Sequence, residues 1–214
     1  MKSVFIAGST GYLGTRLAKS LLDRGYEVRA LARAGSESKA PSGCSVLVGD
    51  ALKPETYRES INADTFVHLI GVAHPSPAKA ELFRTIDLPA AIASIDAAKY
   101  ADVRHFVYLS VAHPAPVMKA YIETRVKAEE HLLSSGMNAT IVRPWYVFGP
   151  GHRWAYALIP FYKICELIPA SREGALRCGL VTLNQMIAAL THAVETPATG
   201  IRYFNVPDIK RFQT

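Results

Sequence analysis

Short apolar runs alternate with helical patterns along most of the chain. The apolar runs predict six strands, over residues 2–7, 26–32, 46–49, 64–71, 104–111 and 139–143. Helical patterns lie between them, most clearly over residues 15–25, 78–100 and 121–135. A repeated strand-then-helix order is typical of a parallel sheet with helices on both faces. We therefore predict an α/β fold with a doubly wound parallel sheet in three layers.

The pattern changes after residue 150, where prolines and aromatic residues become frequent. Four further elements are predicted there: a helix over 158–167, a strand over 175–180, a helix over 183–194 and a strand over 201–206. This tail is too short to form an independent domain. We expect residues 1–150 to form the main domain. Residues 151–214 would form a small lobe over the carboxyl ends of the strands, where open α/β sheets bind their ligands.

Composition and charge narrow the class of protein. The 214 residues are 50% hydrophobic and 20% charged, as in ordinary soluble globular domains. The formal net charge is +6 without a block of consecutive basic residues. A solvated basic surface explains this charge most simply and an anionic cofactor comes second, so no nucleic-acid partner is expected. The most apolar late stretch, residues 156–170, is too short and too interrupted to predict a membrane span.

The cysteine pattern bears on the compartment. Cys44, Cys165 and Cys178 are odd in number and lack the C-x-x-C spacing. They indicate a reducing compartment, which we take to be the cytoplasm, and neither a disulfide framework nor a metal site.

A glycine-rich turn directly follows the first predicted strand. Its sequence, Gly8-Ser9-Thr10-Gly11-Tyr12-Leu13-Gly14, has the spacing G-x-x-G-x-x-G. Gly8 suits a tight turn, Gly11 lets the main chain approach a pyrophosphate, and Gly14 permits close packing of helix on strand. Glycines also mark ordinary turns. The position between a strand and a helix N-terminus nevertheless favours a phosphate-binding turn.

Arg33 and Asp50 follow the second and third strands, where an adenosine is expected. An NAD-preferring site usually carries an acidic residue after its second strand, whereas a guanidinium can pair with a 2′-phosphate. Arg33 therefore favours NADP(H), with NAD(H) possible, although a solvated loop arginine is the alternative. Asp50 is placed to accept from the adenine amino group, or else to cap the next turn.

Together these motifs resemble the short-chain dehydrogenase/reductase superfamily, in its extended and atypical branch of NAD(P)-binding proteins related to NAD-dependent epimerases and dehydratases. The resemblance rests on the glycine turn, Arg33, Asp50, the strand F-V-Y-L-S ending at Ser110, Tyr121, and the stretch R-P-W-Y-V-F-G at 143–149. It covers roughly residues 1–151 and implies a Rossmann-like fold. The cofactor-binding residues that the motifs and the resemblance imply are Gly8, Ser9, Thr10, Gly11, Tyr12, Leu13, Gly14, Arg33, Asp50, Ala51, Ile70, Gly71, Val72, Tyr121, Arg125 and Pro144.

The resemblance also implies a catalytic group. Ser110 would hold a substrate oxygen and Tyr121 would exchange a proton with it, although either residue could instead play a local structural role. Relatives carry a lysine four residues after the tyrosine, but here Arg125 stands in that place. An arginine supplies a fixed positive charge and donors for the nicotinamide ribose, but it cannot relay protons. Asp87, where relatives often have asparagine, is a second departure.

Two functions follow from this site. The first is an oxidoreductase that transfers hydride between NADP(H) and a small carbonyl or alcohol substrate, which the sequence does not identify. The alternative, favoured by Arg125, is an NADP(H)-binding redox sensor or assembly factor with little or no turnover. Trp145, Tyr146, Phe148, Trp154 and Tyr156 would either pack between lobe and sheet or line a hydrophobic substrate site. The protein is expected to be a monomer or a homodimer.

Overall fold

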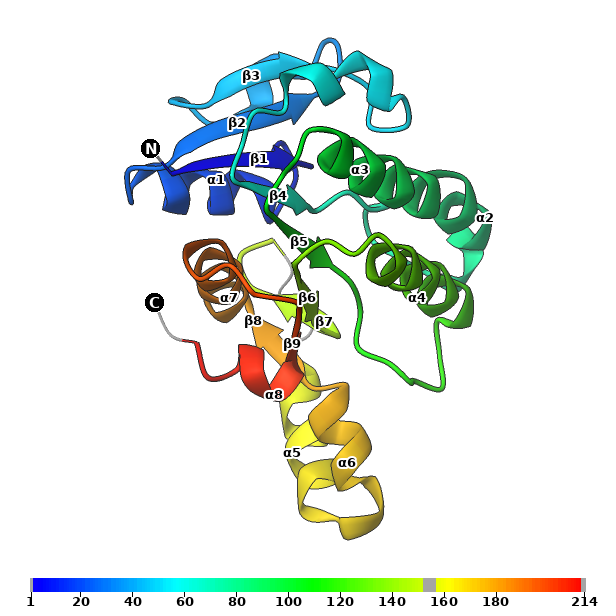
Figure 1. The fold of residues 1–214 in the computed structure, drawn as a ribbon. Coiled ribbons are helices and arrows are strands. Elements are labelled where there is room, and N and C mark those ends of the chain that lie inside the picture. Colours follow the sequence, from blue (N-terminus) through cyan, green and yellow to red (C-terminus); the bar gives the residue numbers. More distant parts are fainter. Residues whose placement is uncertain (1, 152–156, 213–214) are drawn as a thin grey trace.

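A seven-stranded parallel sheet forms the centre of the computed structural model, which describes residues 2–151 and 157–212 (Figure 1). Its strands are β1 (Ser3–Ala7), β2 (Glu27–Ala32), β3 (Ser45–Val48), β4 (Thr65–His68), β5 (His105–Leu109), β6 (Ala139–Arg143) and β9 (Ile201–Asn205). They lie in the order β3-β2-β1-β4-β5-β6-β9, and every neighbouring pair is parallel. The chain crosses over after β3, so β1 and β4 are neighbours. The predicted α/β fold with a parallel sheet is confirmed.

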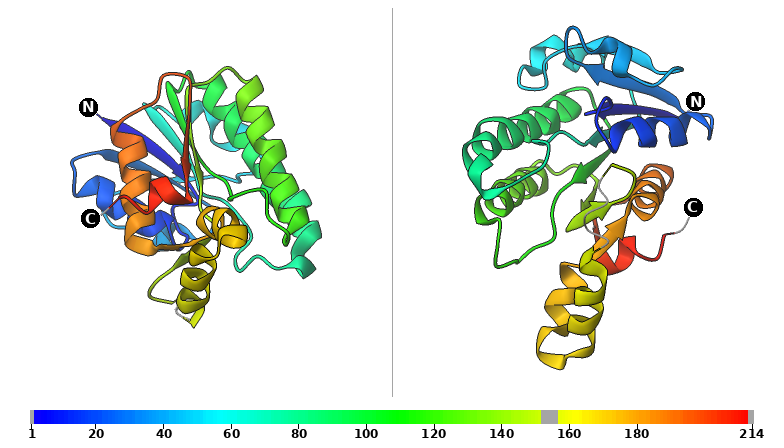
Figure 2. Two further views of the ribbon diagram at one scale, coloured as in Figure 1. Left: turned by 90° about the horizontal axis from the view of Figure 1, so that it is seen from below. Right: turned by 180° about the vertical axis from the view of Figure 1, so that it is seen from behind.

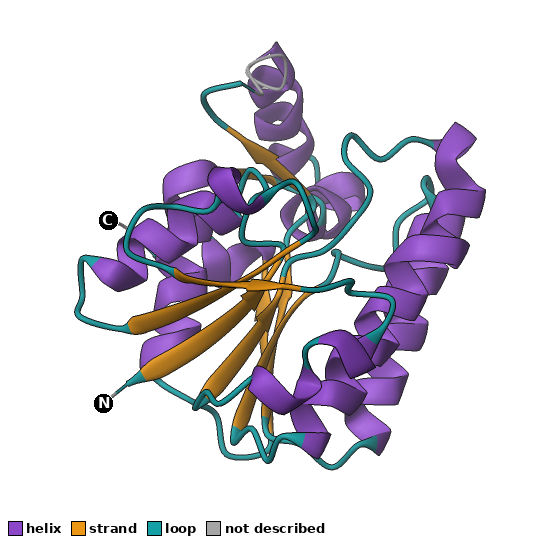
Figure 3. Ribbon diagram, turned by 90° about the horizontal axis from the view of Figure 1, so that it is seen from above, coloured by secondary structure: helices purple, strands orange, loops and turns teal. Residues whose placement is uncertain are grey.

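Helices cover both faces of the sheet, as the views from other sides show (Figures 2 and 3). On one face, α1 (Gly14–Leu22) packs beside α7 (Leu183–Glu195), and on the other α3 (Leu88–Tyr100) packs beside α4 (Lys119–Ser134). The predicted helix over 78–100 is interrupted: α2 (Ala80–Leu82) is followed by a π-helical turn, Phe83–Asp87, before α3 begins. Short 3-10 turns lie at Glu37–Lys39, Pro54–Thr56, Arg58–Ser60 and Pro77–Lys79.

The alternation of side chains along the strands divides the core into two halves. Val4 and Ile6 of β1 point towards α1 and α7, where they contribute to one buried apolar cluster. Phe5 points to the opposite face, where its ring centre lies 4.9 Å from that of Phe66, and Phe66 stacks on Phe106 at 5.2 Å. The central strands β1, β4, β5 and β6 are therefore buried on both faces, which explains why they appear in the sequence as continuous apolar runs, whereas the edge strands β3 and β9 are partly exposed.

The chain after residue 150 contributes to both the main sheet and a small projection. Its strand β8 (Leu180–Thr182) pairs in parallel with β7 (Tyr146–Phe148), which precedes this part of the chain, and α5 (Ile159–Leu167) packs against α6 (Pro169–Arg177). These two helices project from the body of the molecule (Figures 1 and 2). In contrast, α7 and β9 complete the main fold, and α8 (Val206–Ile209) follows β9.

The strand predicted over 175–180 is wrong in its position. α6 continues to Arg177, and β8 begins only at Leu180. Pro169 stands in the first turn of α6, a position where its fixed φ and missing N–H favour a helix. That start signal outweighs the short apolar run on which the strand prediction rests.

Candidate functional site

The glycine turn between β1 and α1 requires its glycines for different reasons. Gly8 has φ of 92°, and a Cβ there would lie 2.9 Å from the carbonyl carbon of Leu69. A Cβ on Gly14 would collide with the carbonyl oxygen of Gly8, so α1 can begin this close to the turn only with glycine. Among the described residues, the only atom near a Cβ added at Gly11 is the Gly8 oxygen, at 3.3 Å. The main chain at Gly11 is therefore open to a ligand.

A cavity of about 430 Å³ lies beside this turn at the carboxyl ends of the strands. We call it the nucleotide cavity. Of the expected cofactor-binding residues it is lined by Gly8, Thr10, Gly11, Arg33, Asp50, Ala51, Ile70, Gly71 and Val72. Leu31, Gly49, Leu52, Leu69, Ile86 and Ala90 complete its lining. The structure thus gathers residues that follow β1, β2, β3 and β4 into one concave site, as expected for ligands of open α/β sheets.

The remaining residues of the glycine turn face elsewhere. The Ser9 hydroxyl donates to the carbonyl oxygen of Leu31 at 3.0 Å and is fully buried, so it ties the turn to β2. Tyr12 and Leu13 pack against the core on the α1 side. These residues shape the turn, and their side chains do not line the nucleotide cavity.

Arg33 and Asp50, the residues expected to meet the adenosine, both line the nucleotide cavity. Arg33 is exposed directly after β2. The Oδ1 of Asp50 accepts from the backbone N–H of Leu52 at 3.0 Å, which is the turn-capping alternative considered above.

Tyr121 lies in a second cavity of about 440 Å³, which we call the aromatic cavity. Its lining is His74, Pro75, Val111, Met118, Tyr121, Trp145, Tyr146 and Val147. Val72 lines the nucleotide cavity and His74 the aromatic one, so the two open along the same loop after β4. Trp145 and Tyr146 belong to the aromatic group expected either to pack between lobe and sheet or to line a substrate site, and both line this cavity. Trp145 also packs against the core, whereas Trp154 and Tyr156 lie outside the described residues.

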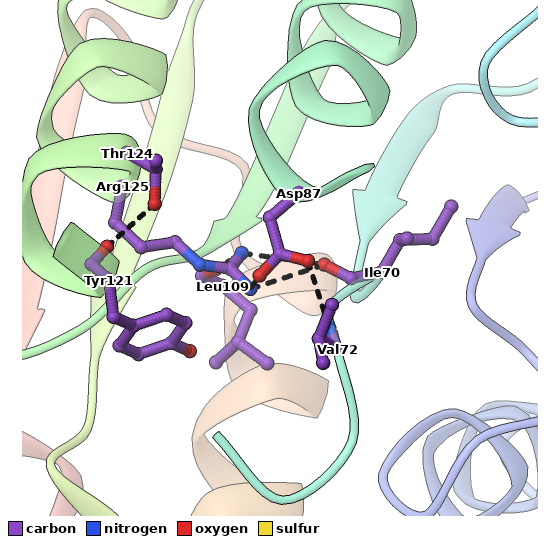
Figure 4. A network of polar contacts seen from close by, with 7 residues as sticks. All are labelled: Ile70, Val72, Asp87, Leu109, Tyr121, Thr124 and Arg125. Carbon is purple, nitrogen blue, oxygen red and sulfur yellow. Dashed lines mark hydrogen bonds and ion pairs between the residues drawn. The ribbon is translucent and has the colours of Figure 1, made fainter. Parts of the chain in front are cut away.

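Arg125 is turned away from the aromatic cavity and into the protein (Figure 4). Its Nη2 pairs with Oδ2 of Asp87 at 3.0 Å, and Nη1 donates to the carbonyl oxygen of Leu109 at 3.0 Å. Both Nη atoms also reach the carbonyl oxygen of Ile70 at 3.4 Å. The two side chains of the pair are 4% and 1% exposed. Arg125 is therefore held inside the protein and lines neither cavity.

The Ser110 hydroxyl likewise forms a hydrogen bond with a buried side chain. Its hydroxyl donates to Oε1 of Glu129, and Ser110 is 2% exposed. Glu129 also accepts from Nε of Arg143 at 3.0 Å, and its Oε2 lies 3.6 Å from Nε2 of His113. The structure thus places Tyr121 at a cavity but does not bring Ser110 into the lining of that cavity. Pro144, expected near the nicotinamide, is buried after β6 and lines neither cavity.

Glu129 is not among the site residues expected from the sequence, although its spacing carries a signal. Tyr121, Arg125 and Glu129 are spaced four residues apart on α4, so all three lie on the face turned to the sheet. Two charged residues on such a face require buried partners, which are Asp87 and Arg143.

The residues of the nucleotide cavity fit a dinucleotide. A bare main chain at Gly11, the N-terminus of the nine-residue helix α1 and an arginine at the adenosine end match the phosphates and ribose of such a ligand. Among the described residues, no cluster of three or more His, Cys, Asp or Glu side chains could hold a metal ion. No helix in the described part of the chain is long and apolar enough to cross a membrane. Fold and site together define a dinucleotide-binding α/β protein.

Comparison with known proteins identifies the family. The NAD(P)H-binding family matches residues 8–153, and the chain belongs to it. The solved structure of the Bordetella bronchiseptica enzyme WbmH in complex with NAD+ superposes with a TM-score of 0.72 at 22% identity. The alignment covers 96% of this chain and 76% of WbmH, and it supports the fold.

Curated relatives include both a reductase and assembly factors. The chain is 25% identical over 211 residues to ceramide reductase of Caulobacter vibrioides, which is 97% of this chain and 65% of that protein. It is 33% identical over 142 residues to the photosystem II assembly factor Ycf39 of Guillardia theta, covering 64% of this chain and 44% of Ycf39. The chain thus spans less than two thirds of the length of either relative.

Proposed function

We propose that this protein is an NADP(H)-dependent reductase of small, apolar carbonyl compounds. The observation that carries the proposal is the placement of Tyr121 in an apolar cavity beside the loop that also lines the nucleotide cavity. Bound NADPH would supply the hydride. The protein would supply the binding cavity, the aromatic wall of Trp145 and Tyr146, and a phenol that donates a proton to the substrate oxygen.

Arg125 contributes to the Tyr121 site through packing. Its guanidinium is bonded to Asp87 and to the carbonyl oxygens of Leu109 and Ile70. Its Cζ lies 5.1 Å from the centre of the Tyr121 ring, so the guanidinium places a positive charge over the ring face.

The preference for NADP(H) rests on Arg33. It follows β2 in the lining of the nucleotide cavity, where its planar fork of donors can pair with a 2′-phosphate.

The cysteines support a reducing compartment, the cytoplasm, since Cys44, Cys165 and Cys178 are all free thiols.

The test is consumption of NADPH with a panel of apolar aldehydes and ketones, wild type against Tyr121→Phe. We expect the loss of one acid catalyst to lower kcat by about 100-fold or more, with NADPH affinity unchanged. Tyr100→Phe is the matched control, because Tyr100 lies on the surface at the end of α3 and bonds to Glu59. Turnover that Tyr121→Phe leaves intact would refute the role of the phenol.

A second function is an NADP(H)-binding sensor or assembly factor without turnover. The hydrogen bond from the Ser110 hydroxyl to Glu129 favours it. A substrate oxygen at Tyr121 would then lack its second hydrogen bond. The similarity to the Ycf39 assembly factor supports the same alternative. Tight NADPH binding without turnover of any aldehyde or ketone in the panel would support this second function over the reductase.

A further inference from the structure

Gly71 stands directly against the buried ion pair of Arg125 and Asp87. A Cβ at this position would overlap Nη2 of Arg125 and lie 3.5 Å from Oδ2 of Asp87. The guanidinium thus occupies the space that any other side chain at residue 71 would need. The main chain of Gly71 therefore packs directly against the Arg125–Asp87 ion pair.

The pair also holds the residues on both sides of Gly71. Arg125 donates to the carbonyl oxygen of Ile70, and Oδ1 of Asp87 accepts from the backbone N–H of Val72 at 2.8 Å (Figure 4). One end of the pair comes from α4 and the other from the π-helical turn before α3. Three consecutive backbone positions after β4 are therefore fixed by two side chains from the helical layer.

Those three backbone positions form one wall of the nucleotide cavity. The same cavity is lined by Arg33, Asp50 and Ala51, which follow β2 and β3. The proposed function puts the adenosine of NADP(H) at these residues, whereas Tyr121 lies in the separate aromatic cavity. Contacts that shape residues 70–72 thus act on the adenosine half of a bound dinucleotide.

We propose that Arg125 and Asp87 are positioning residues for the adenosine half of the cofactor, and that Arg125 does not contact the nicotinamide ribose. The pair acts through the main chain of residues 70–72 and holds the cavity wall in its binding conformation. An ammonium group could not replace the guanidinium, because a single nitrogen cannot reach a carboxylate and two separate carbonyl oxygens with the same planar fan of donors. The inference rests on the NAD(P)H binding of the proposed function but not on turnover.

The test compares affinities for NADPH and for its adenosine half, 2′,5′-ADP, by titration calorimetry of wild type and Arg125→Lys. We expect Arg125→Lys to weaken both ligands by the same factor, about tenfold, as for loss of a charged hydrogen bond. Weakened NADPH binding with unchanged 2′,5′-ADP binding would place Arg125 at the nicotinamide and overturn the proposal. Unchanged affinity for both ligands, or a wild type that binds neither, would overturn it as well.

Asp87→Asn serves as the second variant, in case Arg125→Lys does not fold. Its amide has the shape of the carboxylate but cannot accept from both Val72 and Arg125, so we again expect equal weakening of the two ligands. Tyr100→Phe, on the surface at the end of α3, is the control and should leave the affinity for both ligands unchanged. A failure of the reductase proposal would appear in the turnover measurements, whereas a failure of this proposal would appear in the affinities for the two ligands.

Discussion

Buried His68 should make the protein lose stability when the pH falls below the ordinary titration range of histidine. Its side chain lies on β4 beneath α3, fully buried, with Nδ1 3.0 Å from Oγ of Ser94. Burial lowers the pKa of His68 to about 3, and the positive charge of Arg125 adds to that effect. In the unfolded chain a histidine titrates near ~6.5. Below that pH, residue 68 binds a proton in the unfolded state but stays neutral in the folded state. The free energy of unfolding therefore decreases.

The size of the effect follows from the two pKa values. A pH of about 5 lies ~1.5 units below the pKa of the histidine in the unfolded chain, whereas folded His68 is still neutral at this pH. The free energy of unfolding is therefore about 2 kcal/mol lower than at neutral pH. His105, also buried, has its pKa lowered to about 4, first by burial and then by the charge of Arg202, and should contribute a similar amount. For a domain stable by about 5–15 kcal/mol, the two histidines together are a large fraction.

Urea unfolding at neutral pH and at about pH 5 measures this effect. In His68→Gln the loss of stability between the two pH values should shrink by about 2 kcal/mol, and in the double variant with His105→Gln by about 4 kcal/mol. Other groups that titrate in this range remain in every variant and cancel in the comparison. If His68→Gln kept the pH dependence of the wild type, the neutral, buried state of His68 would be refuted.

Three further predictions test the turn, the cofactor preference and a helix cap. Gly14→Ala should cost about 1–3 kcal/mol and reduce NADPH affinity, because its Cβ meets the backbone of the turn, whereas Gly174→Ala, open on α6, should stabilise by about 1 kcal/mol. Equal changes in urea midpoint would contradict this contrast. Arg33→Ala should weaken NADPH binding about tenfold or more and leave NADH binding nearly unchanged in parallel titrations, and an equal loss for both would remove the argument for NADP(H). Thr182→Ala, which removes the capping box of α7 with Gln185, should lower stability by about 1 kcal/mol in thermal unfolding, while Thr182→Ser should retain most of it.

The order of elements could be predicted because the central strands are buried on both faces. Continuous apolar runs such as residues 2–7 and 139–143 are local signals, and both form strands of the sheet. The failures arise where local signals compete. The tail combines prolines, aromatic residues and short apolar runs, so the sequence predicts no strand at β7 and places β8 too early. Pairing between β7 and β8 depends on contacts across more than thirty positions of the chain, which periodicity does not report.

The sequence by itself determined the parallel sheet, the glycine turn and the position of Arg33, since each depends on residues close together in the chain. Only the tertiary structure decided what the charged residues of α4 do. Arg125 stands where relatives carry a lysine, but the burial of Asp87 and the close approach of Gly71 direct its guanidinium into the helical layer. Ser110 follows a strand as expected, yet Glu129 accepts its hydrogen bond. A buried charge takes the partners that the packed fold places beside it, and those partners come from elements that are distant in the sequence.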